Sequence, residues 1–147
     1  SDRVNMVNAP LIAQERGIKV IESKVSRPQD FASGISLRLR GTENRLIAGA
    51  IFNGGQPRIV RIDGFMLEAI PEGPTLFLQN ADEPGVVGTV GTLLGEGGIN
   101  ISRMQLALVR EERQAAMLIN VDAPPSAALL ERLRAIPHMI TAQLVEL

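Results

Sequence analysis

The residues best suited to chemistry in this 147-residue chain surround one loop in its second half. The loop follows a predicted strand that ends at Asn80, carries Asp82, and leads into a helix with free backbone amides at Gly85, Val86 and Val87. A helix N-terminus attracts a carboxylate, and an aspartate beside it can hold an ammonium group. Because an amino acid carries both groups on one carbon, the loop suits its head group.

The same pattern also has a plainer structural explanation. Asp82 can simply cap the helix predicted over 84–96, since Asp is a favoured N-cap and Pro84 loses no donor in a first turn. Asn100 lies between two apolar residues at the start of the next predicted strand. Its amide either completes the site or only suits the turn, and the residues alone leave both alternatives open.

A row of glycines lies on one side of this helix, at Gly88, Gly91 and Gly95. The apolar residues expected to face the core are Val86, Val87, Val90, Leu93 and Leu94. An interior glycine costs about 1 kcal/mol relative to alanine, so a close approach should compensate for it. The row indicates an interface with a second subunit, with tight packing inside the chain as the alternative.

Composition excludes several function classes. The net charge is −1, from 15 basic and 16 acidic residues, which argues against nucleic acid and membrane partners. Cysteine is absent and His138 is the single histidine, which excludes thiol nucleophiles, disulfides and Cys/His metal sites. With no leader and no apolar run of about 18 residues, we expect a cytoplasmic protein. The opening serine and immediate helical pattern suggest a fragment of a longer chain.

The expected fold class is α+β, in two domains. The boundary is placed at Pro71-Glu72-Gly73-Pro74, giving domains of 1–72 and 73–147. The first domain is an N-terminal helix with a mostly antiparallel sheet: a helix over 4–16 that is kinked at Pro10 or begins near it, and strands over 18–26, 35–40, 46–52, 58–62 and 65–67. The second is a ferredoxin-like βαββαβ domain: strands over 75–80, 99–108, 114–121 and 139–147, and helices over 84–96 and 126–135.

Six arginines are scattered over the first half of the chain: Arg27, Arg38, Arg40, Arg45, Arg58 and Arg61. A cluster of some of them could bind a small anion. The alternative is that they form the solvated face of the sheet.

Two stretches resemble known families. Asn80-Ala81-Asp82-Glu83-Pro84-Gly85 with Gly98-Ile99-Asn100-Ile101 is similar to the ACT domain motif. The N-x-x-N-A-P opening at residues 5–10, together with residues 15–18 and 58–65, resembles the C-terminal half of long-form D-3-phosphoglycerate dehydrogenases. That half joins an intervening, allosteric substrate-binding domain to an ACT domain, so the resemblance covers essentially the whole chain.

The resemblance implies a regulatory role in serine biosynthesis. L-serine would bind between ACT domains of two subunits for feedback inhibition, which requires a homo-oligomer, at least a dimer. One subunit would offer Asn80 and Asp82 and the other Asn100. Family members often carry His where this chain has Asn80, and Asn can also form a hydrogen bond. In the intervening domain, some members bind anions through basic residues on and after the strand that matches residues 58–62. Here Arg58 matches, whereas Phe65-Met66-Leu67 after the turn carries no charge.

Catalysis is expected elsewhere in such a protein. No G-x-G-x-x-G fingerprint follows a strand here, so NAD, and the catalytic residues of an NAD-dependent oxidoreductase, would belong to domains missing from this chain. We expect no catalytic residue, cofactor or metal in the chain itself. Two alternatives remain: the regulatory portion of an L-serine dehydratase subunit, and a structural dimerisation module with no ligand.

Overall fold

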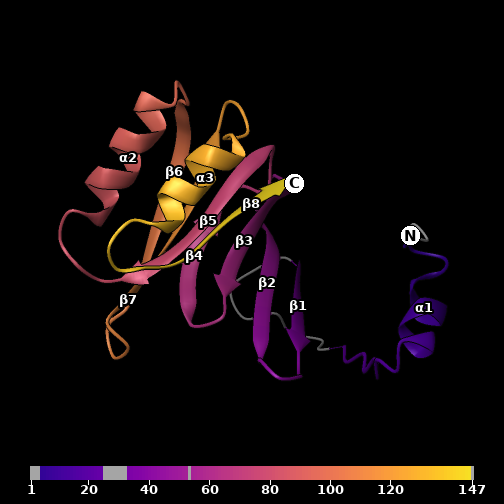
Figure 1. Cartoon of the computed structure of the whole chain (residues 1–147). Helices are drawn as coiled ribbons and strands as arrows, with labels where there is room; N and C mark the ends of the chain where they lie inside the picture. Colours follow the sequence, from indigo (N-terminus) through magenta and orange to yellow (C-terminus); the bar gives the residue numbers. More distant parts are fainter. Residues whose placement is uncertain (1–3, 25–32, 53, 147) are drawn as a thin grey trace.

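The computed structural model describes residues 4–24, 33–52 and 54–146, and these form three helices and two four-stranded sheets (Figure 1). The helices are α1 (Ala9–Glu15), α2 (Val86–Glu96) and α3 (Ala127–Arg134). The strands are β1 (Ser33–Leu39), β2 (Arg45–Phe52), β3 (Gln56–Ile62), β4 (Phe65–Ala69), β5 (Pro74–Ala81), β6 (Ile101–Val109), β7 (Gln114–Val121) and β8 (Met139–Glu146). None of the described helices is long and apolar enough to cross a membrane. The α+β fold class is confirmed.

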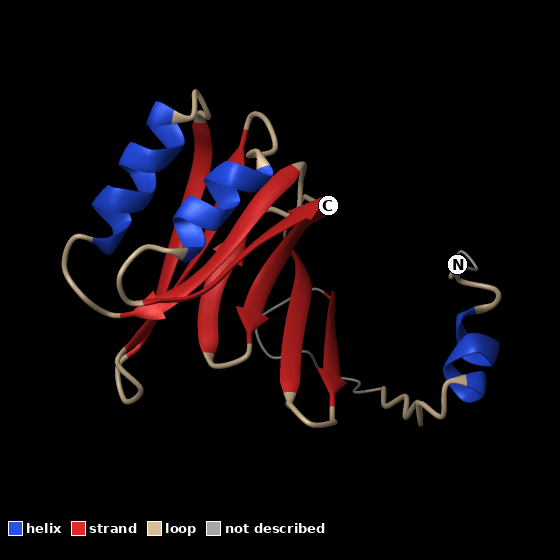
Figure 2. Ribbon diagram, viewed as in Figure 1, coloured by secondary structure: helices blue, strands red, loops and turns tan. Residues whose placement is uncertain are grey.

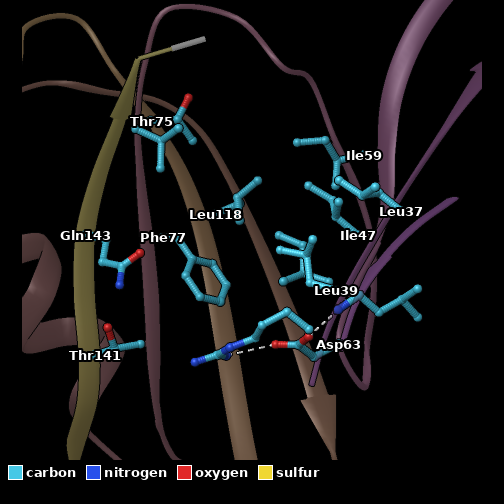
Figure 3. Close-up of a pocket in the computed structure, with 14 residues that line it drawn as sticks. Leu37, Leu39, Ile47, Ile59, Asp63, Thr75, Phe77, Leu118, Thr141 and Gln143 are labelled. Atoms are coloured by element: carbon cyan, nitrogen blue, oxygen red, sulfur yellow. Dashed lines mark hydrogen bonds and ion pairs between the residues drawn. The ribbon is translucent and has the colours of Figure 1, made fainter. Parts of the chain in front are cut away.

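The first sheet is an antiparallel meander in the order β1-β2-β3-β4. The turn predicted at Asp63-Gly64 joins β3 to β4, and Asp63 adopts a left-handed conformation there with φ 50°. Its carboxylate accepts a hydrogen bond from the Leu46 amide at 2.8 Å (Figure 3), and its own amide donates to the Leu46 carbonyl at 2.7 Å. The turn is therefore fastened to the central strand β2.

The N-terminal segment departs from the sequence prediction. The helix begins at Ala9 with Pro10 in its first turn, so residues 4–8 are not helical and the alternative of a start near Pro10 is right. Gly17, with φ +68°, ends it in a Schellman motif. The strand expected over 18–26 does not form in 18–24, where no described strand lies alongside to share hydrogen bonds, and positions 25 and 26 lie outside the described residues. Helix α1 has no buried residue and lies apart from both sheets (Figure 1).

The second sheet has the order β6-β7-β5-β8, with every pairing antiparallel, and the βαββαβ order is confirmed. Helices α2 and α3 cover one face of this sheet (Figure 2). The fully buried large side chains of that layer are Leu76, Leu78, Val90, Leu94, Met117, Ile119 and Leu133. This core fixes both ends of α2 relative to the strands.

The first sheet packs, through β4, against the opposite face of the second sheet. Phe65 of β4 is buried against Ala107 of β6 and Ala116 of β7, and Phe77 packs at the margin of this cluster. The second sheet is therefore sandwiched between two helices and the last strand of the first sheet.

Asn120 of β7 holds the segment that connects the two sheets against the second sheet. Its side chain is 6% exposed, and its amide nitrogen lies 3.2 Å from the Ile70 carbonyl, 2.9 Å from the Glu72 carbonyl and 3.0 Å from the Thr75 hydroxyl. The two carbonyls belong to the segment that joins β4 to β5, and Thr75 is the second residue of β5. One buried amide thus satisfies several acceptors of the connection.

Replacing Asn120 by leucine should lower the free energy of unfolding by about 2 kcal/mol, because the carbonyls that accepted from its amide lose their donor. Urea unfolding followed by circular dichroism measures the change. Asn44→Leu, at an exposed turn, is the control and should change stability by less than about 0.5 kcal/mol. Equal stability of the two variants would contradict the role given to Asn120.

Candidate functional site

Asn80 lies near the end of β5, between Ala115 of β7 and Met139 of β8. It is 2% exposed, and its side-chain nitrogen donates to the Ala81 carbonyl at 2.5 Å. Its side-chain oxygen Oδ1 is buried and accepts no hydrogen bond from the described residues. A buried acceptor without a donor costs about 1–3 kcal/mol, so a donor supplied by a ligand would be favoured there.

Helix α2 begins differently from the prediction. Its N-cap is Gly85, in the left-handed conformation with φ 91°, and no side chain caps it. The expectations that Asp82 caps the helix and that the helix starts at Pro84 are therefore wrong. The backbone amides of Val86 and Val87 form no hydrogen bond within the described part of the chain. The positive end of α2 thus has two amide donors without a partner among the described residues, one on the buried Val86 and one on the exposed Val87.

Asp82 is exposed in the loop between β5 and α2. Its amide donates to the Arg113 carbonyl at 2.8 Å, whereas its carboxylate makes no hydrogen bond or ion pair with the residues that the structure describes. Since it is neither a cap nor an ion-pair partner, this carboxylate can bind a cation beside the start of α2.

Two residues that sequence reasoning missed hold this loop. Arg113 places a guanidinium nitrogen 3.4 Å from Glu83, and the His138 carbonyl accepts from the Ala81 amide at 2.9 Å. Both have positive φ angles, 51° for Arg113 and 71° for His138. Positive φ is uncommon for residues other than glycine, and the contacts of these two residues with the loop depend on strand pairing that the local sequence does not reveal.

Asn100 lies at the other end of α2. It is exposed, its amide donates to an Asp122 carboxylate oxygen at 2.9 Å, and its carbonyl accepts from the Asp122 amide at 3.1 Å. Helix α2 has 11 residues, a length of about 16 Å at 1.5 Å per residue. A single chain therefore brings Asn80, Asp82 and the open amides together, but not Asn100.

No other element of the described structure packs against the glycine row on α2. A Cβ added at Gly88, Gly91 or Gly95 would meet nothing within 4 Å among the described residues. The alternative of tight packing inside the chain therefore finds no support. An interface with a second copy stays a prediction.

An apolar surface adjoins that row. Val87 was expected in the core, but its side chain is 40% exposed, because the helix turns it toward the glycines. Strand β6 is an edge strand, and its Leu106 and Leu108 are 49% and 46% exposed. Leu106 pairs with Met117, whose side chain lies in the core under the helices. We call this area the α2–β6 surface; it comprises Val87, Gly88, Gly91, Gly95, Leu106 and Leu108.

Arg58, the residue predicted to bind an anion, forms hydrogen bonds with its neighbours in β3. Its two terminal nitrogens donate to the Pro57 carbonyl at 2.8 Å and to Gln56 Oε1 at 2.7 Å. Anion binding at this position stays a prediction. Within the described residues, no three His, Asp or Glu side chains lie where they could hold a metal ion together.

Comparison with known proteins gives two matches, one for each part of the chain. Residues 1–63 match the D-3-phosphoglycerate dehydrogenase intervening domain, and residues 75–138 match the ACT domain. The chain carries the intervening and ACT domains of the D-3-phosphoglycerate dehydrogenase family. The loop with Asn80 and Asp82, helix α2 and Asn100 all belong to the ACT domain.

Relatives match along nearly the whole chain. D-3-phosphoglycerate dehydrogenase from Methanocaldococcus jannaschii is 33% identical, over 98% of this chain and 27% of the relative. The enzyme from Synechocystis is 35% identical, over 99% and 26%, and that from Bacillus subtilis 32%, over 98% and 28%. The chain thus spans about a quarter of the length of these relatives.

Proposed function

We propose that this chain is the regulatory and oligomerisation part of a D-3-phosphoglycerate dehydrogenase, and that two copies bind L-serine between their ACT domains for feedback inhibition. The observation that carries the proposal is the buried, unpartnered Oδ1 of Asn80. It lies at the end of β5, in the stretch that leads through Asp82 to the uncapped start of α2. An acceptor, an anion and a positive helix end along one short stretch match the groups of an amino acid.

Each group of serine has a partner in this arrangement. Its carboxylate accepts from the open amides of Val86 and Val87, and its ammonium pairs with Asp82. Its hydroxyl or ammonium donates to Asn80 Oδ1. Asn100 of a second copy closes the site, because the Asn100 of the same chain lies at the opposite end of α2.

Serine would act by favouring one arrangement of the two ACT domains. A ligand that binds between subunits stabilises the arrangement to which it binds more tightly, and the coupling reaches other domains only through that difference. NAD binding, catalysis and the cytoplasmic location belong to this proposal for the whole protein. In it, the present chain supplies no catalytic residue and no cofactor site.

Calorimetric titration of the chain with L-serine tests the proposal. Asp82→Ala and Asn100→Ala should each weaken binding about tenfold or more, the effect of one hydrogen bond to a charged group. L-alanine should bind more weakly than L-serine, since it lacks the hydroxyl. Matched controls are Glu111→Ala and Asn44→Ala, two exposed turn positions whose replacement should leave binding unchanged. Neither heat nor a thermal shift at several millimolar serine would rule the proposal out.

Mixing the two variants tests whether the site is shared. A heterodimer of Asp82→Ala and Asn100→Ala has one site with both changes and one site with neither. The mixture should regain tight binding in its heterodimers, at half the stoichiometry of the unmodified dimer. No recovery on mixing would place Asn100 outside the site.

A further inference from the structure

The turn between β6 and β7 lies against the loop that follows β5. It covers residues 110–113, and the Arg113 amide donates to the Arg110 carbonyl at 3.2 Å. The Arg113 carbonyl accepts in turn from the Asp82 amide at 2.8 Å. Asp82 is the residue proposed above to pair with the ammonium group of serine. The turn is therefore bonded directly to the backbone of a proposed binding residue.

The bond to Asp82 continues the hydrogen-bond pattern of the sheet past the end of β5. In the strand order β7-β5-β8, β5 has a neighbour on each side. At its end, the Ala81 amide donates to the His138 carbonyl on the β8 side, at 2.9 Å. The next amide, that of Asp82, donates to the Arg113 carbonyl on the β7 side. Asp82 thus has a backbone held by the sheet, although it lies outside every described strand.

Arg113 makes this bond in a conformation that its side chain disfavours. Its φ angle is 51°, in the left-handed region, where an arginine is uncommon. Glycine or asparagine would suit the turn better if it only joined β6 to β7. A residue remains in this region where its surroundings fix it. Here the guanidinium lies 3.4 Å from Glu83 while the carbonyl holds Asp82, so Arg113 contacts two successive residues of the loop.

We propose that Arg113 is a positioning residue for the serine site. Its carbonyl, in the left-handed conformation, holds Asp82 where the carboxylate can pair with the ammonium group of the ligand. This inference rests on the proposed function, which assigns the ammonium to Asp82. The backbone of Arg113 matters more than its guanidinium, because the side chains of Arg113 and Glu83 are 79% and 39% exposed and an ion pair so exposed contributes little.

Two replacements at one position separate the backbone from the side chain. Arg113→Gly and Arg113→Val both remove the guanidinium, but glycine adopts a φ of 51° freely and a β-branched valine does not. Calorimetric titration should show L-serine bound about tenfold more weakly by Arg113→Val than by Arg113→Gly, the effect of misplacing one charged partner. Glu111→Val is the matched control, since it puts valine into the same turn at a residue whose φ is not positive, and it should bind serine as the unmodified chain does.

The same pair of replacements in an Asp82→Ala background shows whether the effect acts through Asp82. The proposed partner of the ammonium group is then absent, so Arg113→Val and Arg113→Gly should bind serine equally weakly, within about twofold. A general loosening of the domain would instead weaken binding by the same factor in both backgrounds.

Amide hydrogen exchange, followed by NMR without a ligand, measures the positioning itself. The Asp82 amide should exchange at least about tenfold faster in Arg113→Val than in Arg113→Gly, because the turn no longer holds its acceptor in place. The Ala81 amide is the internal control. It donates to the His138 carbonyl on the other side of β5 and should exchange at the same rate in both variants, which also shows that both are folded.

Three results would each overturn the positioning role. These are equal serine binding by Arg113→Val and Arg113→Gly, an undiminished difference between them in the Asp82→Ala background, and equal exchange of the Asp82 amide in the two variants. A lack of serine binding by the unmodified chain would overturn the proposed function instead. The exchange measurement would still decide whether the β6–β7 turn holds Asp82.

Discussion

Replacing Gly91 by leucine should dissociate the proposed ACT dimer and remove the proposed serine binding while it stabilises the single chain. No neighbouring element among the described residues lies within 4 Å of a Cβ at this position, so the chain leaves room for the start of the new side chain. Leucine also gains about 0.8 kcal/mol of helix propensity over glycine. In the proposed dimer, however, the same side chain would fill the space where a second backbone is expected to approach the α2–β6 surface.

Sedimentation velocity over a range of protein concentrations measures the first effect, and we expect the dimer dissociation constant to rise at least about 100-fold, or roughly 3 kcal/mol. Ala128→Leu is the control, because it adds the same side chain to an exposed position of α3. It should change neither dimerisation nor serine binding. A Gly91→Leu chain that still dimerises and binds serine would show that the glycine row is not the interface.

Much of the ACT domain could be predicted because its sequence signals are local and agree with one another. Strand β7 was predicted with its observed bounds, since its apolar run is interrupted at both ends by polar turns. Helix α3 was placed to within one residue at each end, and the Ser126 side chain accepts a hydrogen bond from the Leu129 amide as an N-cap should.

The start of α2 could not be predicted by the same reasoning. Asp82 and Pro84 both looked like helix-start residues, but Gly85 takes a left-handed conformation that redirects the chain before the first helical residue. Capping preferences describe isolated helix ends, whereas here the loop is also fixed from outside by Arg113 and by the His138 carbonyl. Contacts between residues that are distant in sequence decided this start.

The candidate site, too, could be predicted only in part from the sequence. The identities of Asn80, Asp82 and Asn100 could be read from the sequence, because polar residues at the junctions of apolar elements are conspicuous. That Asn80 has a buried oxygen without a donor, and that Asn100 lies at the far end of α2, follow only from the strand pairing. The sequence named six arginines as candidates for an anion cluster, but only the register of three strands shows that four of them, Arg38, Arg40, Arg45 and Arg61, line one hollow.

The core beneath α2 yields the largest expected effect on folding. Leu94 is fully buried between α2 and the second sheet, and Leu94→Ala should lower the free energy of unfolding by about 3–5 kcal/mol, from lost burial and the cavity left behind. Urea unfolding should be measured in the Gly91→Leu background, where dimerisation does not add to the apparent stability.

Leu106→Ala is the matched control for this core position, because the same atoms are removed from a side chain that is 49% exposed. In the single chain it should cost less than about 1.5 kcal/mol, since much of that surface is already in water. On the unmodified Gly91 background it should instead weaken the dimer, because Leu106 lies on the α2–β6 surface. Equal losses from Leu94→Ala and Leu106→Ala in the single chain would mean that α2 is not anchored by this core. The two ends of α2 would then have no fixed position from which to build a shared site.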